Sequence, residues 1–195
     1  MTLILEKILE DALRVIDYDP NSGVHRKYPL HQEEVSISEK PKDYRDHLFP
    51  YLSELILARG RENGEIQDTI NNALGTNFGQ RGNCQQDCTL YAILFEAHAS
   101  IAMHGDYNFP SKIELWIGKA GFIVGVQQKG RGFNADEISR TGKHREGGGS
   151  GFKTYKELGY DVFFDNPTDA RTVYIMRKIQ AQDKLPCPVP ESPLG

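Results

Sequence analysis

Two short apolar runs in the second half of the chain constrain its fold most. They cover residues 113–117 and 122–126, and only residues 118–121 lie between them. Apolar runs joined by a short glycine-containing turn are typical of an antiparallel hairpin. Two further strands are predicted at 161–164 and 172–176. No crossover helix separates these late strands, so a doubly wound parallel sheet does not fit the chain.

Helical periodicity dominates the first half of the chain. Apolar residues recur at helical spacing over residues 3–17, from Pro41 to Gly60, and over residues 88–104. A short helix is expected at 66–74, and the alternating run at 35–38 is expected to form a strand. This order predicts an α+β fold, a two-layer α/β sandwich with helices packed on one face of a mixed, largely antiparallel sheet.

The chain is long enough for one domain with appendages, at 195 residues. We expect an N-terminal helix and connecting segment over 1–33, the main domain over 34–180, and a disordered, proline-rich tail over 181–195. The N-terminal helix is amphipathic and has to bury its apolar side. It is therefore expected either to pack on the domain or to mediate self-association as a homodimer.

Composition excludes several classes of protein. With 38% hydrophobic and 26% charged residues the chain is typical of a soluble globular protein, and its formal net charge of −4 argues against nucleic acid as a partner. No run approaches the about 18 apolar residues of a membrane span, and the N-terminus is not typical of a signal peptide, so a cytoplasmic location is expected. The three cysteines, Cys84, Cys88 and Cys187, are expected to be free thiols.

Glycines concentrate in one loop, with seven of the nineteen between residues 130 and 151. Gly130 and Gly132 follow an apolar strand, where glycine lets the backbone approach a flat or anionic ligand. Gly149 and Gly151 form a turn that opens a helix expected at about 151–158, whose free N–H groups can face a phosphate. Ordinary turns and a flexible linker are the alternatives.

Charged and polar residues in two segments fit the same kind of ligand. Lys143 and Arg145 lie in the glycine-rich loop, where a mobile basic lid would bring positive charge over a phosphate. Glu96 and Ser100 are four residues apart, so they project from one face of the helix at 88–104. The alternatives are a solvated surface loop and an ordinary solvated glutamate beside a small packing serine.

The order and spacing of these segments resemble the GHKL ATPase superfamily, with its histidine-kinase-like ATPase domain, and within it the anti-sigma-factor serine kinases. The residues that match the motifs of that family are Glu96, Ala97, His104, Gly105, Val126, Gly130, Gly132, Phe133, Gly149 and Gly151. The resemblance covers residues 85–178 well and 34–58 more loosely. It implies a Bergerat-type ATP-binding fold with ATP and magnesium as cofactors.

The resemblance also implies a role for each site residue. Glu96 stands where the family keeps its general base, and Ser100 stands where the family has the asparagine that ligates magnesium. Gln128 replaces the aspartate that accepts from the adenine amino group. The four glycines, 130, 132, 149 and 151, would shape the pocket, with Lys143 or Arg145 at the phosphates.

Two of these positions depart from the family's pattern. Serine reaches less far than asparagine, and poor metal coordination hurts phosphoryl transfer more than binding. The neutral amide of Gln128 is expected to cost about tenfold in affinity relative to a carboxylate. The expected function is therefore a nucleotide-binding regulatory module that acts through a protein partner, with weak or absent phosphotransfer. An active ATP-dependent serine kinase or ATPase, and an unrelated α/β binding domain, remain the alternatives.

Overall fold

The computed structural model describes residues 9–29, 64–78, 90, 93–94, 112–127, 132–137 and 155–184. The strand predicted at 35–38, the helix predicted from Pro41 to Gly60 and the three cysteines lie outside these residues. The described part of the helix predicted at 88–104 is helical at residues 90, 93 and 94. Residues 64–74 form the short helix that was expected at 66–74, which confirms that prediction.

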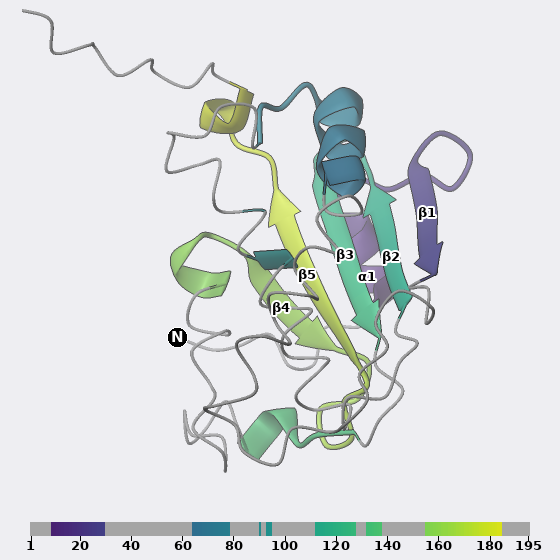
Figure 1. Cartoon of the computed structure of the whole chain (residues 1–195), viewed down its shortest axis with the longest axis vertical. Helices are drawn as coiled ribbons and strands as arrows, with labels where there is room; N and C mark the ends of the chain where they lie inside the picture. Colours follow the sequence, from purple (N-terminus) through teal and green to yellow (C-terminus); the bar gives the residue numbers. More distant parts are fainter. Residues whose placement is uncertain are drawn as a thin grey trace, which may run out of the picture.

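A five-stranded sheet organises the described residues (Figure 1). The strands are β1 (Val24–Pro29), β2 (Lys112–Ile117), β3 (Gly121–Gln127), β4 (Asp161–Phe164) and β5 (Thr172–Lys178). Their order across the sheet is β1-β2-β3-β5-β4, and each neighbouring pair is antiparallel. The α+β fold, the β2–β3 hairpin and the two late strands are therefore confirmed. Strand β1 is an addition, because no strand was predicted at this place.

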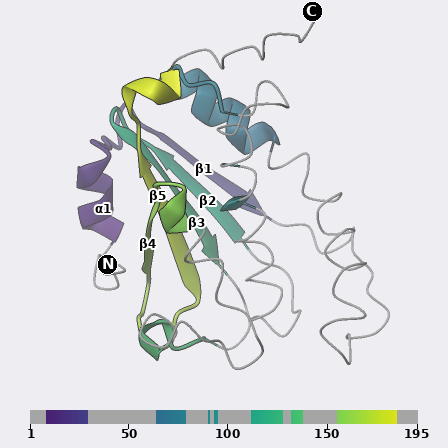
Figure 2. The same cartoon turned by 90° about the vertical axis from the view of Figure 1, so that its left-hand side faces the viewer.

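The main hydrophobic core lies on the face of the sheet that is covered by helix 64–74, seen on the right of Figure 2. Ile66 and Ile70 of that helix are fully buried, as are Leu90 and Ile93. At the centre, Phe122 of β3 makes edge-on contacts with the rings of Phe78 and Tyr160, at centroid distances of 6.0 and 6.3 Å. Packing of the later helices on one face of the sheet thus agrees with the prediction.

Helix α1 (Leu9–Val15) packs on the opposite face of the sheet, whereas the prediction placed the helices on one face (Figure 2). Ala12 and Ile16 are fully buried, and they form a smaller core with Trp116, Ile123, Phe163 and Met176. The helix predicted at 3–17 is confirmed for its described part. The described part of segment 1–33 thus contributes β1, which pairs with β2 at one side of the sheet, and α1, which packs on the sheet. This part of the segment therefore packs on the domain.

The β2–β3 turn docks onto the end of α1. The N–H groups of Lys119 and Ala120 donate to the carbonyls of Asp17 and Ile16, at 3.2 and 3.0 Å. These carbonyls are among the acceptors that the end of a helix leaves without a partner inside the helix. The turn therefore completes the helix end and fixes α1 against the sheet.

The C-terminal prediction needs a correction. Residues Ala181–Lys184 form a short 3₁₀ helix, η2, whereas the chain was expected to be disordered from residue 181. The side chain of Asp183 is buried and pairs with Arg177 of β5, and its carbonyl accepts from the N–H of Asn77. An ion pair inside the protein orders this turn, and proline content alone did not reveal it. Residues 185–195 lie outside the described part.

Candidate functional site

Of the predicted site residues, only Gly132 falls within the described part of the chain. The others lie outside it, namely Glu96, Ser100, Gln128, Gly130, Lys143, Arg145, Gly149 and Gly151. Their relation to one another therefore stays a prediction. The described residues do, however, define the end of the sheet at which β3 leads into the glycine-rich loop.

This end of the sheet, where β3 ends, is the lower one in Figure 1. Gln127, the last residue of β3, pairs with Thr172, the first residue of β5, and Phe164 at the end of β4 pairs with Val173. The chain continues from Gln127 directly into Gln128. The predicted adenine contact, Gln128, is therefore one residue beyond the end of β3.

Gly132 is held against the β4–β5 loop. Its neighbour Phe133 exchanges two backbone hydrogen bonds with Ala170, at 3.1 and 2.9 Å. A Cβ atom on Gly132 would lie 2.6 Å from Cγ and 2.8 Å from the carbonyl carbon of Asp169. The close approach of these two segments requires glycine at this position, whether or not a ligand also contacts it.

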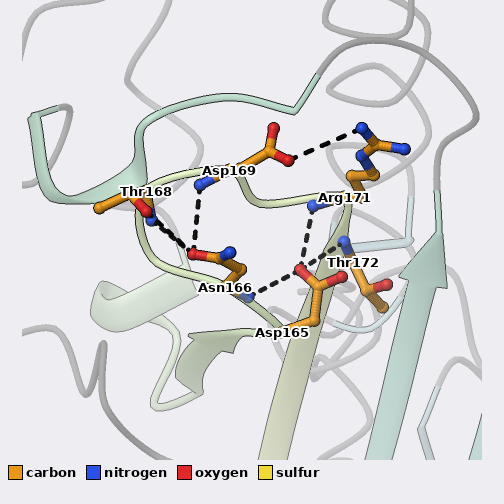
Figure 3. Close-up of polar contacts among 6 residues, drawn as sticks. All are labelled: Asp165, Asn166, Thr168, Asp169, Arg171 and Thr172. Atoms are coloured by element: carbon orange, nitrogen blue, oxygen red, sulfur yellow. Dashed lines mark hydrogen bonds and ion pairs between the residues drawn. The ribbon is translucent and has the colours of Figure 1, made fainter.

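The β4–β5 loop against which Gly132 packs is fixed by its own hydrogen bonds (Figure 3). One carboxylate oxygen of Asp165 accepts from the backbone N–H groups of Asn166, Arg171 and Thr172, each at 3.0 Å. These bonds tie the end of β4 to the start of β5. The exposed Asp165 thus orders the connection between the two late strands.

A second acceptor in the same loop is the side-chain oxygen of Asn166 (Figure 3). It accepts from the N–H and hydroxyl of Thr168, at 3.0 and 3.1 Å, and from the N–H of Asp169 at 3.3 Å. The carbonyl of Pro167 accepts from the N–H groups of Ala135 and Asp136. The loop is therefore a preformed platform that holds segment 132–137 at this end of the sheet.

Substitution of Gly132 tests this packing. Gly132→Ala is expected to lower the free energy of unfolding by about 1–3 kcal/mol, because the methyl group forces Asp169 and its backbone away. Urea unfolding of the variant measures this loss. The double variant with Asp169→Ala should recover part of it, because the side chain of Asp169 supplies the nearest atoms. Unchanged stability of Gly132→Ala would contradict the packing role.

A row of aromatic rings crosses the other face of the sheet, next to α1. His25 stacks on Trp116 at 5.0 Å, and Phe163 stacks on Tyr174 at 4.9 Å. Gly125 lies between the two pairs, where a Cβ atom would come within 2.9 Å of the Tyr174 ring and 3.1 Å of the Trp116 ring. Glycine in the middle strand therefore lets the two rings approach each other.

Beside this row, Glu114 of β2 collects three basic side chains. It forms an ion pair with Lys112, and its carboxylate lies 3.7 Å from Nζ of Lys27 and 3.6 Å from Nε2 of His25. Burial alone would raise the pKa of Glu114. The hydrogen bond from Lys112 and the charges of these neighbours outweigh burial and hold the pKa below its ordinary value.

The lowered pKa of Glu114 makes a prediction about acid stability. The ionised carboxylate stabilises the fold above its ordinary pKa, and this contribution is lost as pH falls below about 4.5 and through the lowered value. Glu114→Gln should therefore lose less stability than the wild type on acidification from pH about 5 to 3. Thermal unfolding across this range measures the difference. Parallel pH profiles of the two proteins would contradict the assignment.

Sequence reasoning missed this second group of residues. Lys112, Glu114 and Trp116 alternate along β2, which is the spacing of one face of a strand. Lys27 and His25 join them only through the pairing of β1 with β2, which places Lys27 opposite Glu114. The alternation was visible in the sequence, but the partner strand was not.

A groove of about 700 Å³ lies between β1 and the start of helix 64–74. Two of its charged side chains pair with each other, since Nη1 of Arg26 lies 3.3 Å from the hydroxyl of Thr69 and 3.7 Å from the carboxylate of Glu65. The volume is in the range of small-molecule pockets, but its one cationic side chain, Arg26, is already paired with Thr69 and Glu65. We therefore assign it no chemistry.

The described ranges contain no cluster of three or more His, Cys, Asp or Glu side chains able to hold a metal ion. Within the same residues, no helix has the length and apolar character needed to cross a membrane. Comparison of the chain with family models, curated proteins and solved structures finds no match.

Proposed function

We propose that this chain is a nucleotide-binding regulatory module with a histidine-kinase-like ATPase fold, resembling the anti-sigma-factor serine kinases. The observation that carries the proposal is the order of elements along the chain. Helical residues 90, 93 and 94 precede the β2–β3 hairpin, the glycine-rich loop follows in the sequence, and helical residues 155–157 precede the antiparallel pair β4 and β5. This is the order that the resemblance implies.

The proposed site places adenine at Gln128, directly beyond the end of β3. Gly149 and Gly151 would present backbone N–H groups to the phosphates, with Lys143 or Arg145 supplying positive charge. The platform at the β4–β5 loop supports this arrangement, because its own hydrogen bonds fix segment 132–137, which follows the predicted adenine contact in the sequence. A platform that is already ordered lowers the entropic cost of ordering the site when a ligand binds.

Phosphotransfer is proposed to be weak or absent. Glu96 would be the general base and Ser100 the magnesium ligand, and bound magnesium would neutralise charge on the phosphates. A serine hydroxyl replaces the family's amide oxygen at the metal position. The module would then act by holding a protein partner according to its nucleotide state, with catalysis secondary.

Calorimetric titration with ATP, with and without magnesium, tests this function. We expect weak, saturable binding that depends little on magnesium, and Gln128→Asp should strengthen it about tenfold. Gln127→Asp is the matched control, because its side chain is exposed on β3 one residue before the predicted contact. No heat of binding at millimolar ATP would contradict the proposal.

The same titration separates the regulatory module from an active enzyme. A large gain in ATP affinity with magnesium, together with turnover that disappears in Glu96→Ala, would identify an active kinase or ATPase. Ser100→Asn should increase the effect of magnesium on affinity if this position faces the metal. An unchanged effect of magnesium in this variant would argue against Ser100 as a metal ligand.

A further inference from the structure

The short turn η2 lies against the upper end of the sheet in Figure 1, beside the loop that follows helix 64–74. Among the described side chains of this turn, Asp183 is buried, whereas Ala181 and Lys184 are exposed. The carboxylate of Asp183 is seated on the guanidinium of Arg177. No residue of η2 belongs to either core of the described part of the chain, so this ion pair and a few hydrogen bonds hold the turn.

Contacts outside η2 fix the guanidinium of Arg177. It lies over the rings of Phe78 and Tyr160, at 5.5 and 4.9 Å from their centroids. The faces of these rings attract a cation. In addition, Nη1 of Arg177 donates to the carbonyl of Leu158 at 2.7 Å. None of these contacts involves the turn, so they hold the arginine in place independently of Asp183.

The guanidinium of Arg177 offers more donors than Asp183 uses. Nη2 donates to Oδ1 of Asp183 at 2.6 Å, and Oδ2 accepts from the N–H of Gln180 at 2.9 Å. Nε of Arg177 is buried and has no hydrogen-bond partner among the described residues. Nε and Nη2 lie on one edge of the planar group, where a single carboxylate can accept from both. Asp183 takes only one of these two donors.

We propose that Arg177 and the two rings form a carboxylate-binding site, which Asp183 fills from within the chain, and that η2 is a strap that lifts to admit a carboxylate from outside. The group that occupies the site in the structure is itself a carboxylate, and the unpartnered Nε favours a ligand that binds both donors of the edge. Arg177 pairs with Phe122, near the start of β3, so this site lies at the opposite end of the sheet from Gln128. It is independent of the proposed nucleotide site.

Lifting of η2 is a local event, because the turn follows β5 and its release leaves the five strands paired. It breaks the bonds from the N–H and Nδ2 of Asn77 to the carbonyls of Asp183 and Lys184, at 3.2 and 3.3 Å. Hydrogen exchange of the Asn77 N–H therefore reports the open form. A ligand that binds only this form raises its population in proportion to ligand occupancy.

Native-state hydrogen exchange of the full chain tests the strap. We expect the N–H of Asn77 to exchange faster than the N–H groups of β3, through an opening that does not unfold the sheet. Sodium formate at about 100 mM should speed exchange at Asn77 about tenfold relative to sodium chloride at the same ionic strength. Exchange in β3 should not change.

Chemical rescue of Asp183→Ala tests the site itself. This variant empties the site, so formate should raise its folding equilibrium constant about tenfold, measured as a higher midpoint of urea unfolding. Asp169→Ala is the matched control, because it removes the exposed partner of Arg171 and should gain nothing from formate. N-acetyl-aspartate amide replaces formate in a second series. The stronger of the two compounds identifies the ligand as a protein side chain or as a small free acid.

Three results would overturn the proposal. The first is exchange of the Asn77 N–H only together with β3, which would show that η2 does not lift. The second is an effect of formate no larger than that of chloride. The third is an equal effect of inorganic phosphate, or an equal gain in Asp169→Ala, which would show an adventitious ion only. The exchange measurement uses the wild type, so it decides the matter even where Asp183→Ala fails to fold.

Discussion

Replacement of Asp183 by alanine is expected to lower the free energy of unfolding by about 3–5 kcal/mol, because it leaves the buried guanidinium of Arg177 without its counter-ion. Nη2 of Arg177 lies 2.6 Å from Oδ1 of Asp183. The two side chains are only 11% and 1% exposed. Removing one partner of such a buried pair lowers the free energy of unfolding far more than removing an ion pair at the surface.

The surroundings of the pair explain why Arg177 cannot move to solvent at low cost. Its guanidinium lies over the rings of Phe78 and Tyr160, at 5.5 and 4.9 Å, and Nη1 donates to the carbonyl of Leu158. The other carboxylate oxygen of Asp183 accepts from the N–H of Gln180 at 2.9 Å. The pair therefore ties η2 to β5 and to the main core.

Urea unfolding of Asp183→Ala measures this loss, and two comparisons make it specific. Asp169→Ala removes the exposed pair with Arg171, at 3.6 Å, and should cost at most about 1 kcal/mol. The double variant Arg177→Met with Asp183→Leu should be more stable than Asp183→Ala, because it removes both buried charges. Losses of the same size in Asp183→Ala and Asp169→Ala would contradict a buried, uncompensated charge.

Phe122→Ala is expected to destabilise the protein by about 3–5 kcal/mol, because it opens a cavity at the centre of the main core. Phe122 is fully buried in β3 and contacts the rings of Phe78 and Tyr160. These residues come from segments on either side of β3 in the sequence. The loss should therefore appear as a lower midpoint of one cooperative unfolding transition.

The control for Phe122→Ala is Leu13→Ala in α1. Leu13 is only half-buried at the edge of the smaller core, so its removal should cost less than about half as much. Urea unfolding followed by circular dichroism compares the two variants. A larger loss in Leu13→Ala would mean that α1, and not the face covered by helix 64–74, carries most of the stability.

The sequence predicts the elements whose apolar pattern is their own. The runs at 113–117 and 122–126 are apolar enough to define β2 and β3 without knowledge of the rest of the fold. Strand β1 escapes the same reasoning because His25, Arg26 and Lys27 interrupt its apolar pattern. Its place becomes clear only from its pairing with β2, which depends on contacts between distant parts of the chain.

The candidate site is predictable to a smaller extent, for the same reason. The glycine spacing identifies Gly132 as unusual, but its contact with Asp169 comes from a loop far along the chain. A small pocket beside Trp116 combines alternate residues of three strands, so it exists only once the register of β2, β3 and β5 is set. Motif spacing reports local chemistry and does not report which strands become neighbours.

The crystal structure of the full chain with a non-hydrolysable ATP analogue tests the central claim most directly. We expect the adenine beside Gln128, one residue beyond the end of β3, and the phosphates at the N–H groups of Gly149 and Gly151. Gly132 should keep its contact with Asp169 in the complex. An analogue that is absent at millimolar concentration, or that binds away from this end of the sheet, would contradict the proposed function.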